Sequence, residues 1–333
     1  MKSICVFNNK GGVGKTTLLC NLAAYFAKNK NKKVLVVDAD PQCNATAYAL
    51  KEELLERVYG SSSKTIDDLV KPLRRGRGYT TGALPVIKSE GFGFDLIPGD
   101  PKFALAEDFL SKDWVDARGG SERGLQTTLV FRELLSRAKA YDLVFFDIGP
   151  SLGAINRTVF IASDYFLIPM SSDIFSLRGL QNIQLSLKSW ETGLASGLSQ
   201  YEEQEGSSFE VNGKSISISI KFLGYVTQQY TAKTVDGKKQ PVKAYEKIIR
   251  KIDPEIKKHV IDVFNTASDP AEYKLGEIPY LQSLVPLSQT SCKPIFSLGS
   301  ADGVVGAHFD KVKEFGSVIA SISRRVELNL AVL

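Results

Sequence analysis

The sequence predicts an α/β fold, a doubly wound and mostly parallel twisted sheet flanked by helices. Short apolar runs of strand length alternate along the chain with longer segments of helical periodicity. Residues 1–40 follow the order strand, glycine-rich loop, helix and strand, a unit whose right-handed crossover makes its two strands parallel. The run Val-Leu-Val-Val at residues 34–37 lacks polar alternation, as is typical of a strand buried on both faces.

The remaining elements follow the same alternation, and we expect a single domain over residues 1–333. Strands are expected at residues 2–7, 34–37, 94–97, 143–146, 165–168 and 216–226. Helices are expected at residues 15–28, 125–139, 176–194 and 301–324. Two polar stretches, at about residues 51–92 and 196–215, interrupt the pattern and are interpreted as surface insertions.

The composition is that of a soluble globular protein, with 43% hydrophobic and 24% charged residues. No stretch approaches the roughly 20 apolar residues that span a bilayer, and the apolar run after Lys2 ends at Asn8, too early for a signal peptide. The four cysteines are scattered, without a CxxC pair or metal-site spacing. We therefore expect a cytoplasmic protein with reduced thiols, located at the nucleoid if it binds DNA.

A glycine-rich loop, Asn-Asn-Lys-Gly-Gly-Val-Gly-Lys-Thr-Thr at residues 8–17, joins the first strand to the first helix. Its glycines allow the backbone amides to approach a polyphosphate at the amino end of the helix. In the general phosphate-loop pattern, Lys15 would reach the β and γ phosphates and the Thr16 hydroxyl would bind Mg²⁺. The loop therefore predicts ATP and Mg²⁺ binding. An ordinary glycine-rich turn is the alternative.

The octet from Lys10 to Thr17 resembles the deviant phosphate-loop motif of the ParA/MinD ATPases, with most similarity to the ParA/Soj-like partition ATPases. In that family the first glycine is relaxed, as at Asn9 here, and an additional lysine appears, which Lys10 matches. The family lysine crosses to the phosphates of the partner subunit in an ATP-bound sandwich dimer, and the resemblance implies the same for Lys10. Nucleotide contacts are expected from Lys10, Gly11, Gly12, Val13, Gly14, Lys15, Thr16 and Thr17.

Two further segments extend the resemblance to the hydrolytic machinery. Residues 38–46 are similar to the first switch of the family, with Cys43 in place of the usual glycine, and this match implies that Asp40 orients the attacking water. Asp147 ends the apolar run 143–146 and resembles the family's metal-binding aspartate, with Gly149 where a second proline is frequent. Capping of the loop at the strand end is the alternative for Asp38 and Asp40.

The expected roles can be stated as two sets. Positioning of water and neutralisation of phosphate charge carry most of the catalysis of phosphoryl transfer. The catalytic set is Lys10, Lys15 and Asp40, and the resemblance implies weak ATP hydrolysis that a partner stimulates. The Mg²⁺ set is Thr16, Asp38 and Asp147, in which Asp38 supports the switch or the water shell of the metal.

The base would lie against a late segment of the chain. Residues 283–288 and 293–296 resemble the part of the family that walls the adenine. This match places Val285, Pro286 and Leu287 beside the base, with the amide of Gln228 or Gln229 at its edge. Residues 228–231 depart from the Met-Tyr-Asp-x-Arg pattern that is usual there.

Residues 233–258 concentrate the positive charge of the chain. They contain nine lysines and arginines against four aspartates and glutamates, a net +5 that equals the formal charge of the whole chain. Such a surface could neutralise DNA phosphates without reading sequence. The expected contacts include Lys238, Lys239, Lys243, Lys247, Arg250 and Lys251. A solvated basic helix is the alternative, and residues 71–77 form a second basic patch.

The leading hypothesis is a ParA-like ATPase that dimerises on ATP, binds DNA nonspecifically and positions or segregates DNA or other cargo. A ParB-like or other partner would stimulate hydrolysis. An ATP-gated partner-binding switch without a DNA role is the main alternative, and a metabolic relative with the same loop is another. A MinD-like membrane association is disfavoured, because the apolar residues of the last predicted helix have core-like spacing.

Overall fold

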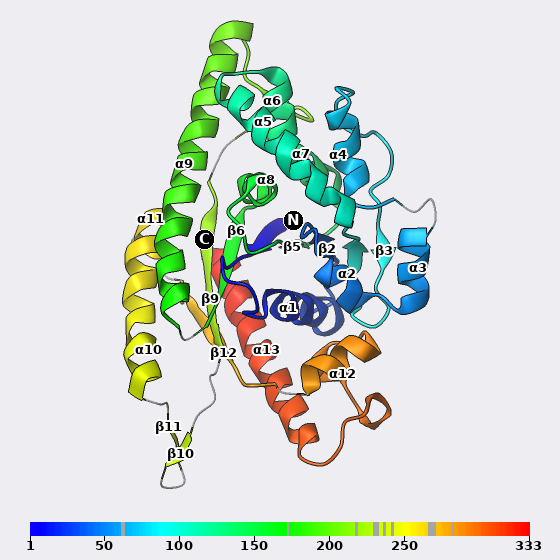
Figure 1. Cartoon of the computed structure of the whole chain (residues 1–333), viewed down its shortest axis with the longest axis vertical. Coiled ribbons are helices and arrows are strands. Elements are labelled where there is room, and N and C mark those ends of the chain that lie inside the picture. The colour runs from blue at the N-terminus through cyan, green and yellow to red at the C-terminus, as the bar shows by residue number, and fades with distance from the viewer. Residues whose placement is uncertain are drawn as a thin grey trace.

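An eight-stranded sheet forms the centre of the protein (Figure 1). The computed structural model describes residues 1–60, 64–171, 173–216, 219–228, 233–235, 238–240, 243–265, 271–281 and 283–333. The strands lie in the order β12-β9-β6-β1-β5-β2-β4-β3. All neighbouring pairs in this sheet are parallel except β3 with β4. The predicted doubly wound, mostly parallel α/β fold is therefore confirmed.

The strand bounds agree with the apolar runs of the sequence. They are β1 Lys2–Val6, β2 Val34–Asp38, β3 Ile87–Lys88, β4 Asp95–Ile97, β5 Leu143–Asp147, β6 Tyr165–Met170, β9 Lys221–Gln228 and β12 Lys274–Ile278. Two hairpins lie outside the sheet, β7 Glu210–Val211 with β8 Lys214–Ser215, and β10 Lys233–Val235 with β11 Lys238–Gln240. The strand predicted at residues 216–226 corresponds to β9, which begins later, at Lys221, and ends at Gln228.

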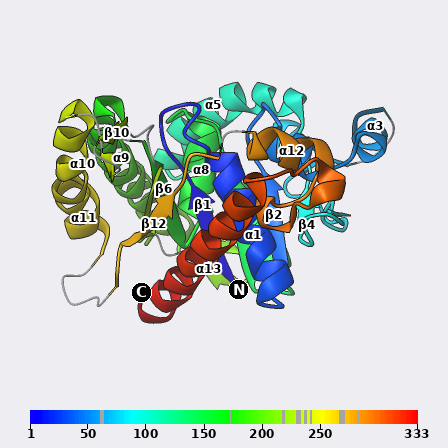
Figure 2. The same cartoon turned by 90° about the horizontal axis from the view of Figure 1, so that it is seen from below.

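Helices cover both faces of the sheet (Figures 1 and 2). One face carries α1 Lys15–Asn29, α2 Asn44–Ala49, α12 Leu284–Ser291 and α13 His308–Val332, and the other carries α5 Ala106–Arg118, α6 Glu122–Thr128, α7 Val130–Arg137, α8 Ala154–Ala162 and α9 Ile174–Glu205. The further helices are α3 Glu52–Gly60, α4 Asp67–Arg74, α10 Lys243–Ile256 and α11 Asp262–Phe264, with a π-helical turn at Lys257–Ile261. Short 3₁₀ segments occupy Pro101–Leu105, Ile295–Ser297 and Ser300–Asp302.

Side-chain alternation explains why the central strands are apolar throughout. Ile4 of β1 enters the core beneath α1 and α13, whereas Cys5 enters the core beneath α5 to α9. In β2, Val36 enters the core beneath α1 and α13, and Val37 enters the core on the other face. Because successive side chains point to opposite faces, a strand between two helical layers has no solvent face to mark with polar residues.

The largest difference from the predicted elements is in α9, which continues to Glu205. The polar stretch 196–215 is thus helical in its first part and ends in the β7–β8 hairpin. Leu194 is fully buried, and a Cβ on Gly197 would lie 2.0 Å from the Ala117 carbonyl of α5. Glycine makes this contact close, while Leu198 and Tyr201 continue the apolar face of α9 beyond its predicted end.

Two other helices also differ from their predicted bounds. The segment 125–139 divides at Leu129 into α6 and α7, and the last helix begins at His308 rather than near residue 301. Within residues 51–92 the structure contains α3, α4 and β3, and α4 buries Leu69 and Val70 in the core. No helix among the described residues is long and apolar enough to cross a membrane.

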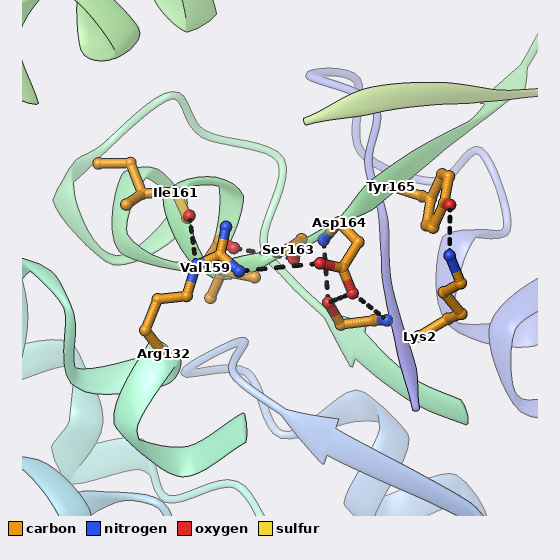
Figure 3. A network of polar contacts seen from close by, with 8 residues as sticks. Lys2, Arg132, Val159, Ile161, Ser163, Asp164 and Tyr165 are labelled. Carbon is orange, nitrogen blue, oxygen red and sulfur yellow. Dashed lines mark hydrogen bonds and ion pairs between the residues drawn. The ribbon is translucent and has the colours of Figure 1, made fainter. Parts of the chain in front are cut away.

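A polar network fixes the amino ends of β1 and β6 (Figure 3). The Asp164 carboxylate accepts hydrogen bonds from the backbone amide and hydroxyl of Ser3, at 2.9 and 2.7 Å. Arg132 of α7 lies 3.7 Å from the same carboxylate and donates to the Ile161 carbonyl. The network joins these strand ends to α7 and α8. The cleft described below lies at the other end of the sheet, where the strands have their carboxyl ends.

Candidate nucleotide and magnesium site

The glycine-rich loop lies at the carboxyl end of β1 and leads directly into α1. Gly12 and Gly14 have φ angles of 73° and 67°, in the left-handed region that favours glycine. Gly14 is the N-cap of α1 and has no side chain with which to cap the helix. The first amides of α1 are therefore available to an anion at this end of the helix.

A cleft of about 780 Å³ opens beside this loop. This volume lies in the range of small-molecule sites. Its lining comprises Gly11, Gly12, Gly14, Lys15, Thr16, Thr17, Leu18, Asp40, Gln42, Asn44, Ala47, Tyr48, Pro150, Gln228, Ile278, Pro279, Tyr280, Leu281, Val285, Gln289 and Phe315. Segments from both ends of the chain thus meet around the loop, with most of the predicted phosphate residues on one wall and an apolar wall opposite.

The apolar wall agrees only partly with the predicted base contacts. Val285 lines the cleft, whereas Pro286 and Leu287 are not among its lining residues. Leu287 packs in the core beside α1 and lies against Gly303. The turn of α12 explains this difference, because consecutive residues on a helix face different directions.

Sequence reasoning missed the part of the wall that follows β12. Ile278, Pro279, Tyr280 and Leu281 all line the cleft. Their position at the carboxyl end of a parallel strand was the available signal, because ligands bind at that edge of open α/β sheets. The short strand β12, with its polar Lys-Leu-Gly-Glu-Ile sequence, was not recognised.

Gln228 also lines the cleft, but its amide is engaged with the loop. Its Nε2 atom donates to the Val13 carbonyl at 2.5 Å. A Cβ on Gly14 would lie 2.3 Å from the same nitrogen. Gly14 therefore needs both its left-handed conformation and its missing side chain, whereas Gln229 lies outside the described residues.

Two buried aspartates stand side by side at the ends of β2 and β5. Asp38 pairs with Asp147 in the strand register. Asp147 Oδ2 accepts a hydrogen bond from the Thr16 hydroxyl at 2.7 Å, and Asp38 Oδ2 accepts from the amide and hydroxyl of Thr46 at 2.7 and 2.6 Å. The Oδ1 atom of each aspartate is buried and has no hydrogen-bond partner among the residues that the structure describes.

Burial controls the ionisation of this group. Burial first, and the charge of neighbouring carboxylates second, raise the pKa of Asp38 to about 7 and that of Asp147 well above its usual range. Burial lowers the pKa of Lys15, while Asp147 and Asp40 oppose this change. Two unsatisfied carboxylate oxygens beside a threonine hydroxyl fit Mg²⁺, which prefers oxygen ligands and would offset the buried negative charge.

Asp40 lies on the loop that follows β2 and lines the same cleft. Its Oδ1 accepts the Gln42 amide at 3.0 Å, and its carbonyl accepts the Cys43 amide at 2.8 Å. Cys43 has a φ of 54°, a left-handed conformation that costs a non-glycine residue free energy. Across the cleft edge, a Cβ on Gly149 would lie 3.4 Å from Asp40 Oδ1.

Lys10 points away from the phosphate loop of its own chain. Its ammonium forms an ion pair with Asp173 at 2.8 Å, and its side chain is 41% exposed. Its backbone amide donates to Asn8 Oδ1 at 2.9 Å. Lys15, Thr16 and Asp40 line the cleft, whereas Lys10 does not. Asp38 and Asp147 are buried behind the lining, where Asp147 contacts Thr16.

Comparison with known proteins identifies the family of the chain. A family sequence model described as an AAA domain, of ParA/MinD type, matches residues 1–199. The chain belongs to the ParA/MinD family of ATPases. A chromosome-partitioning ATPase Soj from Thermus thermophilus is 32% identical over 195 residues, 58% of this chain and 64% of Soj. A virulence plasmid ParA family protein from Chlamydia psittaci is 31% identical over 185 residues, 55% of this chain and 62% of that protein.

The alignments thus span less than two thirds of these two relatives. Among solved structures, protein DIP2308 from Corynebacterium diphtheriae is 29% identical and superposes with a TM-score of 0.76, covering 99% of both chains. The ATP complex of Cyanothece McdA(D38A) has a TM-score of 0.62 at 17% identity, covering 100% of this chain and 97% of McdA. That similarity supports the fold. Members of this family are P-loop ATPases.

Replacing the loop lysine tests the phosphate site. Lys15→Ala is expected to abolish measurable ATP binding, because it removes the one ammonium that lines the described cleft. Isothermal titration with ATP and Mg²⁺ measures the change. Lys32→Ala, which alters an exposed lysine beyond the far end of α1, should bind like the wild type. Unchanged affinity in Lys15→Ala would exclude the assigned loop.

A second test concerns the buried carboxylates. Asp147 has a folded-state pKa above its unfolded value of 3.8, so its ionisation costs stability increasingly as pH rises from about 4. Asp147→Asn is therefore expected to raise the free energy of unfolding of the nucleotide-free protein at pH 8 by roughly 1–3 kcal/mol. The gain should shrink at pH 5. Urea denaturation at both pH values measures it.

Exposed Asp116→Asn is the control for this comparison and should change the free energy of unfolding little at either pH. An Asp147→Asn protein that is less stable than the wild type at pH 8 without nucleotide would contradict the account of the buried charge.

Proposed function

We propose that this chain is a ParA-like ATPase that binds ATP and Mg²⁺ in the cleft, dimerises on ATP and hydrolyses it. One observation supports the proposal. Beside the open amino end of α1, the Thr16 hydroxyl donates to Asp147, and in the described part of the chain Asp147 and the adjacent Asp38 each keep one buried carboxylate oxygen without a hydrogen bond. Lys15 lines the same cleft and supplies a charge for phosphate.

The residues of the chain would divide the work of hydrolysis. The α1 amides and Lys15 hold the β and γ phosphates, and Thr16, Asp38 and Asp147 hold Mg²⁺ directly or through its waters. Mg²⁺, when bound, supplies charge neutralisation at the phosphate oxygens. Asp40 orients the attacking water from the opposite side. Little covalent chemistry is needed, so the rate depends on how well the Asp40 loop is positioned.

Dimerisation would bring Lys10 into the site of a second copy. Lys10 and Asp173 are 41% and 24% exposed, and ion pairs of such exposure contribute about 1 kcal/mol or less. A triphosphate on the opposing subunit offers several more negative charges. The intrachain pair can therefore hold Lys10 in place in the monomer and still yield when ATP is bound across the interface.

Nonspecific DNA binding is the proposed output of the dimer. α10 buries Ile252 and Ile256 and presents Arg250 and Lys251 to solvent on its other side, and Lys257 and Lys258 of the π-helical turn are also exposed. Such a helix can place several cations along a phosphate backbone. The side chains of Lys238, Lys239, Lys243 and Lys247 lie outside the described part of the structure.

The protein would position DNA or another cargo. A ParB-like or other activating partner protein would link this cargo to the ATPase. Relatives described as chromosome-partitioning and plasmid proteins support this assignment.

The role of Lys10 across the interface can be measured directly. Lys10→Ala is expected to remain a monomer with Mg²⁺ and a non-hydrolysable ATP analogue, because the phosphates lose their partner cation. Light scattering after size exclusion gives the mass. Asp173→Asn keeps Lys10 and removes its intrachain partner, so it should dimerise at least as readily as the wild type. A nucleotide-dependent Lys10→Ala dimer would refute the proposed role.

DNA binding is tested through its salt dependence. For the ATP-loaded protein, the slope of log K against log[salt] is expected to be shallower by about 2 in a double variant, Arg250→Ala with Lys251→Ala, if both contact phosphates. Fluorescence anisotropy with a random duplex measures it. The control, Lys112→Ala with Lys139→Ala, removes two exposed charges from α5 and the end of α7. Absence of DNA binding at low salt would favour the switch without DNA.

A further inference from the structure

Glu107, in the first turn of α5, caps a different helix. Its carboxylate accepts hydrogen bonds from the backbone amides of Ala154 and Ile155, the latter at 3.0 Å. These are the first residues of α8, whose N-cap residue Gly153 provides no side-chain cap. A helix begins with amides that have no partner inside it and with partial positive charge, so a carboxylate from α5 satisfies both needs at once.

Gly153 permits this contact through its missing side chain. A Cβ on Gly153 would lie 2.3 Å from Glu107 Oε1. Its φ is −82°, which any residue can adopt, so the backbone itself does not require glycine. The constraint at this position is therefore the approach of the carboxylate, and a methyl group would displace the end of the Glu107 side chain without straining the chain.

The capped end of α8 in turn holds the loop that follows Asp147. The buried Asn156 donates through Nδ2 to the carbonyls of Gly149, at 2.7 Å, and Ser151. Pro150 lines the nucleotide cleft, and Gly149 faces Asp40 Oδ1 across it. The position of the α8 amino end therefore sets the position of the loop beside the proposed water-orienting carboxylate.

The segment before α5 reaches the other side of the same site. The Gly99 amide donates to the Thr46 hydroxyl at 2.8 Å, and that hydroxyl donates to Asp38. A Cβ on Gly99 would lie 3.0 Å from Asp38 Oδ2. Residues 99–107 thus form a strap that runs from the support of Asp38 to the cap of α8.

A second contact fixes α5 against α8. The Arg157 guanidinium lies over the Trp114 ring, 4.6 Å from its centroid, and donates to the Leu110 carbonyl at 3.1 Å. Burial lowers the pKa of Arg157 to about 10, and the negative charge of Glu107 opposes this change. The two helices therefore meet at a packed cation on one side and at the Glu107 cap on the other.

We propose that Glu107 is a positioning residue for ATP hydrolysis, which fixes the loop at residues 148–153 opposite Asp40 by capping α8. The proposal rests on the ATPase activity proposed above. The hydrogen bonds of Glu107 go to α8 and not to the phosphate loop, so nucleotide binding and water positioning should separate when Glu107 is changed.

The test compares three variants with the wild type, Glu107→Gln, Glu107→Ala and Gly153→Ala. Each is expected to lower kcat about 10-fold, the scale of a lost helix cap, while KM and the Kd for ATP stay within about twofold. Asp108→Ala removes a neighbouring exposed carboxylate of α5 and should match the wild type. Hydrogen exchange of the nucleotide-free proteins should be faster at residues 148–156 in the three variants alone.

The exchange measurement separates this inference from the proposed function. If the wild type hydrolyses no ATP, the proposed function fails, and faster exchange at residues 148–156 still supports the cap as the element that positions the loop. If exchange there is unchanged in all three variants, or if Asp108→Ala matches their loss of kcat, the inference is overturned. Gly153→Ala leaves the carboxylate in the chain, so it also decides the case in which Glu107→Ala fails to fold.

Discussion

The site depends on keeping two carboxylates out of water with too few hydrogen bonds. Asp38 and Asp147 are fully or almost fully buried, and within the described part of the chain each has one oxygen without a partner. Such a pair costs free energy, and the proposed Mg²⁺ would offset this cost by satisfying the unpaired oxygens. The parallel register of β2 and β5 creates this pair, since it aligns the two strand ends at one level.

The fold could be predicted largely because its central strands are buried on both faces. Each such strand must be apolar over its whole length, and residues 34–37 and 143–146 show this in sequence. The far part of α9 lies beyond the predicted end of the helix, because Gly193, Gly197 and many polar residues weaken the helical signal there. Its apolar face nevertheless continues through Leu194, Leu198 and Tyr201.

In the candidate site, too, some residues could be predicted from the sequence and others could not. The phosphate loop is local in sequence, so its glycines and Lys15 were found together, and the strand-end aspartates were found from the runs they terminate. The apolar wall is assembled from β12, α12 and α13, which are distant from the loop in sequence. Which residue of residues 285–287 faces the cleft depends on the rotation of α12, and only Val285 does so.

The strap at residues 99–107 gives the two loops of the site a common support. Thr46 connects it to Asp38 on one side, and Asn156 connects the helix that it caps to Gly149 on the other. A displacement of α5 would therefore change the geometry near Asp40 through α8 and the support of Asp38 through Thr46. The phosphate loop itself follows β1 and leads into α1, so its backbone does not depend on this strap.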